Sequence, residues 1–143
     1  MQREIKFRGK RVDNGEWVCG SYHFSADGKY HYILAREKFV DVEPHFCYLH
    51  EKEVWQVIPE SVGQFTGLKN SLGKEIWEGD IIHCLKKGMQ FGAVEQVEFK
   101  RGCFILRHRD IPVSVFEEFE DFEDFMDIVV VGNIYENPEL LTH

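Results

Sequence analysis

The sequence predicts a mainly β protein, with an antiparallel meander first and a small barrel or sandwich after it. Three observations predict this class. Short segments alternate apolar and polar residues, turn signals such as Asn14-Gly15 and Arg101-Gly102 recur along the chain, and 14% of the 143 residues are aromatic. Aromatic side chains fit pleated surfaces, and many short strands separated by turns are typical of sandwiches and barrels.

The first half is expected to form a meander of three strands. Residues 3–8 alternate charged and apolar side chains, which is the period of a half-buried strand. Asn14-Gly15 readily adopts positive φ at both positions, as a type I′ hairpin turn requires. Residues 17–25 would return from that turn, and residues 30–35 would follow a second turn at 26–29.

The stretch that follows is expected to end the first of two subdomains. Residues 39–42 favour a short strand before Pro44, residues 45–53 indicate a loop or a helical turn, and residues 54–58 favour a strand that Pro59 ends. A boundary near residues 59–62 gives an N-terminal antiparallel β subdomain at 1–61 and a second subdomain at 62–143.

The second half alternates strands with tight turns. Residues 65–68 and 75–77 would pair around a turn at 69–74. Gly79-Asp80 would open a strand over 81–85, because glycine permits a tight corner and aspartate can bond nearby backbone N–H groups. Strands over 91–100 and 103–108 would meet at Arg101-Gly102, and residues 127–134 would form the last strand.

One short helix is expected near residues 114–126. Phenylalanines recur there at every third position, at Phe116, Phe119, Phe122 and Phe125, with acidic residues between them. This spacing places all four rings on one side of a helix. The phenylalanine face would pack inward, or alternatively would form a stripe that binds a partner. Asn137-Pro138 would start one further helical turn.

Negative charge is concentrated at the C-terminal end. The chain has 17 Lys and Arg against 25 Asp and Glu, a net charge of −8. Residues 112–143 hold 9 of these acidic residues and no Lys or Arg, which leaves 17 basic and 16 acidic residues in the rest of the chain. A net negative charge opposes nonspecific DNA binding, which depends on Lys and Arg displacing counterions from phosphate.

Cysteine usage and hydropathy predict a cytoplasmic protein without a membrane segment. No apolar run approaches the roughly 20 residues that span a bilayer, and the basic N-terminus is not followed by the apolar region of a signal peptide. The cysteines are scattered without a CxxC pair, and we expect them to be free thiols. They are Cys19, Cys47, Cys84 and Cys103.

Catalytic and metal-binding motifs are weak. His45, Cys47 and His50 are ligand types that suit zinc, but their spacing is not one of the familiar zinc spacings and a fourth ligand is not evident. His83 and Cys84 are neighbours on a predicted strand, so they would point to opposite faces and could not act as a catalytic pair. We therefore expect no bound metal, no cofactor and no enzymatic activity.

Three blocks resemble the YopX family, a group of small proteins encoded by phages and prophages. They are residues 63–82, which hold GQFTGLKNSLGKEIWEGDII, residues 3–10, which hold REIKFRGK, and residues 131–141, which hold VGNIYENPELL. The blocks keep the family's order and span nearly the whole chain. The resemblance implies a mainly β fold with an SH3-like roll or barrel in the second half, and it places the protein in a bacterial host's cytoplasm. It implies no biochemical activity.

The function expected from the sequence is therefore recognition. We expect a non-enzymatic accessory protein that binds a protein partner or itself, because small barrels offer exposed strand edges and aromatic surfaces. Trp17, Trp55 and Trp77 are candidates to line such a surface. An alternative is a nucleic-acid-binding barrel that uses the basic first strand. Its candidate residues are Lys6, Arg8 and Lys10, which would contact phosphate or, alternatively, an acidic patch of another subunit such as residues 116–127. A metal-dependent enzyme is the second alternative.

Overall fold

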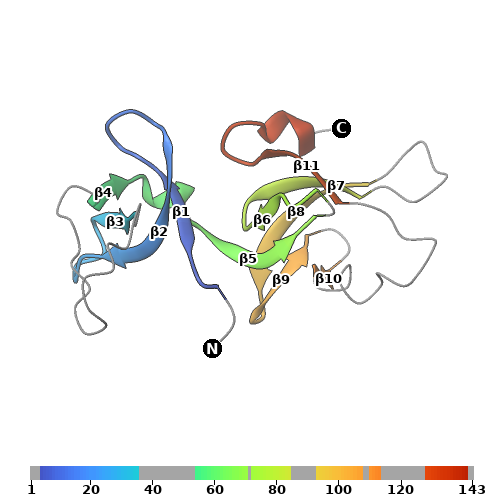
Figure 1. The fold of residues 1–143 in the computed structure, drawn as a ribbon, viewed down its shortest axis with the longest axis horizontal. Helices are drawn as coiled ribbons and strands as arrows, with labels where there is room; N and C mark the ends of the chain where they lie inside the picture. The colour runs from blue at the N-terminus through green and yellow to red at the C-terminus, as the bar shows by residue number, and fades with distance from the viewer. Residues whose placement is uncertain are drawn as a thin grey trace. The chain divides into compact units, whose positions relative to one another are not determined.

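The computed structural model describes residues 4–35, 54–70, 72–84, 93–107, 110–113 and 128–141. Within these ranges the chain forms eleven β-strands and two 3-10 helices (Figure 1). The predicted mainly β fold is confirmed. The chain divides into two compact units, Met1–Gln64 and Phe65–His143, called unit 1 and unit 2 below. The helix predicted near 114–126 and the strand predicted over 39–42 lie outside the described residues.

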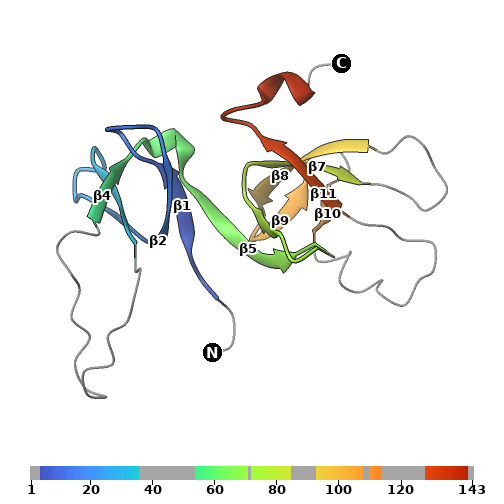
Figure 2. The same cartoon turned by 45° about the horizontal axis from the view of Figure 1, so that its top comes forward.

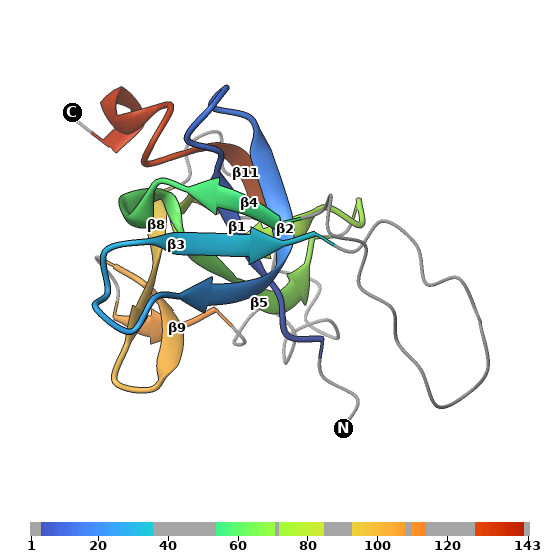
Figure 3. The same cartoon turned by 90° about the vertical axis from the view of Figure 1, so that its left-hand side faces the viewer.

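Unit 1 begins with the predicted antiparallel meander. Its strands β1, β2, β3 and β4 each pair with the next, and the last three lie side by side in Figure 3. Their bounds are Phe7–Lys10 for β1, Trp17–Phe24 for β2, His31–Leu34 for β3 and Val54–Val57 for β4. The first strand thus begins later than the sequence predicts.

The meander of unit 1 curls until β4 meets β1 again. Arg11 forms a β-bridge with Val57, and the N–H of Ile58 donates to the carbonyl of Lys10 at 2.8 Å. The 3-10 helix η2 (Pro59–Ser61) follows β4 and adds a side-chain bond. The buried Ser61 hydroxyl accepts from the Lys10 N–H at 2.8 Å. Strands β1 to β4 therefore form a small barrel-like ring.

The first hairpin turn differs from the predicted type I′ turn. Gly15 has a φ of +72°, but Asn14 is not among the described residues with positive φ. The loop is longer, because the N–H of Arg11 donates to the carbonyl of Glu16 across it at 2.9 Å. Asn14 contributes its side chain instead, since its Oδ1 accepts from the Glu16 N–H at 2.9 Å. The turn therefore has one residue with positive φ, Gly15, and the hydrogen bond to the Asn14 side chain takes the place of the second that a type I′ turn requires.

Strand β5 (Gly63–Lys69) continues from unit 1 into unit 2 (Figure 2). It pairs with β1 through Gly63 and Gln64, and with β6 from Phe65 onward. The hydrogen-bonded strand orders are β4-β3-β2-β1-β5-β6 and β10-β9-β8-β7-β11. The second order ends at β10 and β11, so the described strands of unit 2 form a barrel-like sheet that is not closed.

The remaining elements of unit 2 follow the predicted order, except for the short strand β10, which the sequence analysis did not predict. They are β6 (Glu75–Trp77), β7 (Asp80–Cys84), β8 (Ala93–Lys100), β9 (Cys103–Leu106), β10 (Ile111–Pro112), β11 (Ile128–Asn133) and the 3-10 helix η3 (Pro138–Leu141). The predicted tight turn between β8 and β9 is confirmed, because Arg101 and Gly102 have φ values of +51° and +80°. The described segments contain no helix that is long and apolar enough to span a bilayer.

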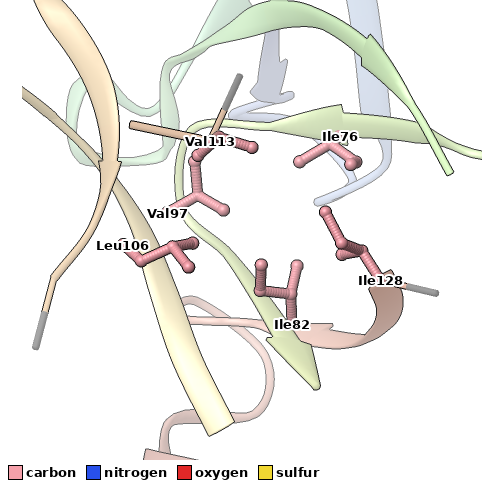
Figure 4. Packing of buried hydrophobic residues seen from close by; sticks show 6 residues of the cluster. All are labelled: Ile76, Ile82, Val97, Leu106, Val113 and Ile128. Carbon is pink, nitrogen blue, oxygen red and sulfur yellow. The ribbon is translucent and has the colours of Figure 1, made fainter. Parts of the chain in front are cut away.

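The core of unit 2 is aliphatic. Six buried side chains from β6, β7, β8, β9, β11 and the residue after β10 form one cluster, and they point toward one another in Figure 4. They are Ile76, Ile82, Val97, Leu106, Val113 and Ile128. Since β6, β7, β8, β9 and β11 each contribute one of these residues, the cluster holds the sheet and the β6 segment together.

Candidate interaction surface

The three basic residues predicted to bind a partner lie on or just before β1. Lys6 is paired with Glu4 at 3.1 Å, and its side chain is 19% exposed. Arg8 and Lys10 both approach the ring of Trp17, with the Arg8 guanidinium carbon 4.7 Å and the Lys10 Nζ 5.4 Å from the ring centroid. Trp17 faces Lys10 across the β1–β2 pair. The structure thus brings two cations and one indole together.

Trp55 is covered by a different cation. The guanidinium carbon of Arg11 lies 3.6 Å from the Trp55 ring centroid, which is stacking contact. The same guanidinium donates to both carboxylate oxygens of Asp13, at 2.9 and 2.6 Å, and lies 3.7 Å from Glu16. The hydrogen bond to Asp13 raises the pKa of Arg11, and the bond from Arg11 lowers the pKa of Asp13. Arg11 was not among the predicted site residues.

Trp77 lies in the interior of unit 2. Its side chain is 7% exposed and packs against Phe65 with ring centroids 5.3 Å apart. Because Phe65 and Trp77 are opposite one another in the β5–β6 pair, this contact fixes the register of the hairpin. The indole therefore has little surface to offer a partner.

Among the described residues, the most exposed of the large aromatic side chains belongs to a group that the sequence analysis did not identify. Phe24 is 64% exposed and lies at the end of β2. Its ring is 5.8 Å from Tyr22 and 6.2 Å from His31, and Tyr22 is 5.3 Å from Phe7. We call Phe7, Tyr22, Phe24 and His31 the hairpin aromatic cluster. Alternation along β2 could have suggested the pair Tyr22 and Phe24, but not their partner on β3.

A polar chain runs through the hairpin aromatic cluster. The Tyr22 hydroxyl is hydrogen-bonded to Nδ1 of His31, and Nε2 of His31 lies 3.0 Å from the carbonyl oxygen of Gly28. Burial raises the pKa of the Tyr22 hydroxyl. The turn beside it is ordered by Asp27, which accepts from the N–H of Lys29 at 3.0 Å and whose pKa is lowered by the hydrogen bond from Ser25.

The Gly79-Asp80 pair has a structural role in the described part of unit 2. Asp80 is 2% exposed, and its carboxylate accepts from the N–H of Trp77 at 2.8 Å. Gly79 has a φ of +89°, donates its N–H to Val97 at 2.8 Å and accepts from Ile134 at 2.9 Å. The predicted bonding of Asp80 to nearby backbone is confirmed.

The C-terminal block near Gly132 also pairs a glycine with a side chain that bonds to nearby backbone N–H groups. The side-chain oxygen of Asn133 accepts from the N–H groups of Tyr135 and Glu136 at 3.0 and 2.9 Å. A Cβ on Gly132 would lie 2.5 Å from Oδ1 of Asn137, so the close approach requires glycine. These contacts give structural roles to Gly79, Asp80, Gly132 and Asn133, which lie in two of the three blocks that resemble the YopX family.

The metal alternative falls mostly outside the described residues, since His45, Cys47 and His50 are not among them. In the ranges that the structure describes, no three His, Cys, Asp or Glu side chains gather as a metal site would require. Cys19 and Cys103 are free thiols, as expected.

Comparison with known proteins identifies a family. A search of curated proteins finds no match. The crystal structure of protein EF1440 from Enterococcus faecalis is similar in fold, with a TM-score of 0.56 and 22% identity over 98% of this chain and 99% of that chain. The family model described as "YopX protein" matches residues 6–142, which is nearly the whole sequence. The chain therefore belongs to the YopX family.

Proposed function

We propose that the protein is a non-enzymatic phage or prophage accessory protein that binds a protein partner or a second copy of itself. The hairpin aromatic cluster of unit 1 is its contact surface. Recognition without turnover agrees with the structural roles that account for Asp80 and Asn133.

One observation carries this proposal. Phe24 leaves 64% of its surface in water although two rings of the same cluster lie within 6.2 Å of it. A ring held by neighbouring rings loses little conformational freedom when a partner covers it, and aromatic anchors of this kind often dominate interface energy.

The test replaces Phe24 by serine. Phe99 of unit 2 supplies a matched control, because it is 50% exposed and lies 5.2 Å from a neighbouring ring, that of Phe104. We expect the wild-type protein to show excess mass by light scattering or to retain a partner in affinity capture from infected cells. Phe24→Ser should weaken that association about tenfold or more, while Phe99→Ser should leave it unchanged.

Two results would contradict the proposal. One is a wild-type protein that stays monomeric at micromolar concentration and captures no partner. The other is an equal loss of association in the Phe24 and Phe99 variants, because this would point to general surface stickiness. Circular dichroism spectra of both variants establish that they are folded.

A nucleic-acid-binding barrel is the second candidate. The observation that favours it is the placement of Arg8 and Lys10 over Trp17, since cations and aromatic rings together are what single-stranded nucleic acids contact. The net charge of −8 opposes it. Retention on single-stranded DNA that weakens with salt and is lost in Lys6→Glu with Arg8→Glu would support it. A metal-dependent enzyme remains the third, and elemental analysis of the purified protein tests it.

A further inference from the structure

His31 connects the Tyr22 hydroxyl to the backbone of the β2–β3 turn. The Nε2 atom of the ring lies 3.0 Å from the carbonyl oxygen of Gly28, and the Nδ1 atom is hydrogen-bonded to Tyr22. The rings of Tyr22 and His31 are stacked, with 17° between their planes. Both side chains come from facing strands, where Tyr22 and Phe24 lie opposite Ile33 and His31.

The bond to Gly28 decides which nitrogen of His31 carries the proton. A carbonyl oxygen can only accept, so Nε2 must be the donor. In the neutral imidazole Nδ1 is then unprotonated, and it accepts the hydrogen bond that the Tyr22 hydroxyl donates. Tyr22, His31 and Gly28 therefore stand in the order of a nucleophile, a base and a group that orients the base.

The surroundings of Tyr22 favour activation of its oxygen by a neighbouring base over activation by prior ionisation. Burial raises the pKa of its hydroxyl, so the free phenolate is disfavoured at neutral pH. The proton must instead be transferred to an acceptor during the reaction. His31 occupies that position, and the exposed ring of Phe24 lies beside both side chains.

We propose that Tyr22 is a covalent modification site, at which His31 acts as the general base and an electrophilic acyl, sulfonyl or phosphoryl donor supplies the group. The Tyr22 Oη forms a bond to the electrophilic carbon, sulfur or phosphorus, and the bond from that atom to its leaving group breaks. The leaving group departs with the bonding electron pair. The hydroxyl proton passes to Nδ1 of His31, which later releases it to water. An aromatic leaving group or substituent could stack on Phe24.

A group on Tyr22 would also alter the proposed contact surface, and this consequence rests on the proposed function. Acylation or phosphorylation removes the proton that Tyr22 donates to His31 and adds bulk next to Phe24. The hairpin aromatic cluster would then present a different surface. Modification would therefore weaken the association that Phe24 supports.

The experiment uses benzenesulfonyl fluoride as the probe and measures the rate of adduct formation at each tyrosine by mass spectrometry. Tyr30 is the internal control, because it is 49% exposed and therefore at least as accessible as the half-buried Tyr22. We expect the adduct at Tyr22 to form about tenfold faster than that at Tyr30 at pH 7.5, because general-base assistance commonly contributes 10² or more. Tyr22→Phe removes the fast adduct.

Two variants of His31 distinguish its role as a base from its role in packing against the neighbouring rings. His31→Phe keeps an aromatic ring in the cluster, while His31→Asn keeps a hydrogen-bond acceptor that is a very weak base. Both should slow labelling of Tyr22 by about tenfold and leave Tyr30 unaffected. His23→Asn, in the exposed neighbouring position on β2, should change neither rate.

The pH profile gives a readout that a purely structural role would not produce. Imidazoles gain a proton between about pH 5 and 8, and an imidazolium cannot take the Tyr22 proton. The rate of Tyr22 labelling should therefore level off above that pH range, where a neutral imidazole is always present, whereas labelling of Tyr30, which has no such base, should keep rising toward alkaline pH. Among the described residues, Tyr22 on β2 is the ionisable side chain hydrogen-bonded to His31, and the partner of His31 on β4, Val57, does not titrate.

Equal labelling rates at Tyr22 and Tyr30, or wild-type rates in both His31 variants, would overturn the proposal. These outcomes are independent of partner binding. A fast adduct at Tyr22 together with an unchanged association of the labelled protein would uphold the modification site and reject only its effect on the contact surface.

Discussion

Asp80 in unit 2 and His31 in unit 1 are both polar side chains on strands, yet they engage different partners. Asp80 is 2% exposed and accepts a hydrogen bond from the backbone N–H of Trp77. Its carboxylate therefore stabilises the fold. His31 is half-buried and binds a tyrosine hydroxyl beside a phenylalanine that is 64% exposed. Asp80 thus stabilises a corner of the backbone, whereas His31 orders side chains at a surface.

The same contrast appears in the apolar side chains. Unit 2 buries its aliphatic cluster almost completely, and Trp77 joins its interior. In unit 1 the rings of Trp17 and Trp55 lie under cations, and Phe24 lies open to water. Residues that bury apolar surface contribute mainly to stability, while ordered exposed rings are more informative about binding. This contrast supports the proposal that recognition lies in unit 1.

The largest expected effect tests the core of unit 2. Ile82 is 0% exposed within the aliphatic cluster, so Ile82→Ala should lower the free energy of unfolding by about 4 kcal/mol, through lost burial and a residual cavity. Denaturant titration measures this loss, and hydrogen exchange should locate it in unit 2. Val131→Ala is the control, because Val131 is 41% exposed and should cost less than about 0.5 kcal/mol. If Ile82→Ala and Val131→Ala lowered the free energy of unfolding equally, the assignment of Ile82 to the core and Val131 to the surface would be wrong.

A second prediction addresses close packing in unit 1. A Cβ on Gly20 would lie 2.0 Å from the carbonyl oxygen of Leu34, which belongs to the backbone and cannot rotate away. Gly20→Ala should therefore cost about 3 kcal/mol. Gly28→Ala is the comparison, because a Cβ there meets nothing within 4 Å. Its φ of +72° alone should cost about 1 kcal/mol. Thermal unfolding of both variants decides whether the steric clash dominates.

A third prediction concerns Asp80. Asp80→Ala removes the acceptor of the buried Trp77 N–H, and an unsatisfied buried donor costs about 2 kcal/mol. Asp80→Asn keeps one oxygen and should recover part of that loss. The midpoint of chemical denaturation measures both. If the two variants were equally stable, the hydrogen bond to Trp77 would not explain why aspartate follows Gly79.

The smallest expected effect involves one ion pair in each unit. Arg11 lowers the pKa of Asp13, and Arg101, 2.5 Å from Asp110, lowers the pKa of that carboxylate. A lowered folded-state pKa means that the stabilisation is present above the unfolded value, about 3.9, and is lost as pH falls through the folded value. NMR titration of the two carboxyl carbons should show both depressions, and salt should reduce them. A lowered pKa for only one of the two carboxylates, Asp13 or Asp110, would contradict this prediction.

The local sequence determined much of the secondary structure. Alternation predicted the meander, Arg101-Gly102 predicted a tight turn, and Gly79-Asp80 predicted the start of β7, because each depends on residues close together in the chain. The Asn14 turn was predicted with the wrong geometry, since a side-chain bond to Glu16 supplies what a second positive φ would have supplied.

Tertiary structure decided which residues form a site. Trp17, Trp55 and Trp77 are alike in the sequence, but strand pairing places the first two under cations and the third inside unit 2. Tyr22 and His31 are nine residues apart, and only the register of β2 against β3, with the turn that brings Gly28 to the ring, joins them. Periodicity reports the face of a strand, whereas a contact between side chains depends on which strand lies beside it and in which register.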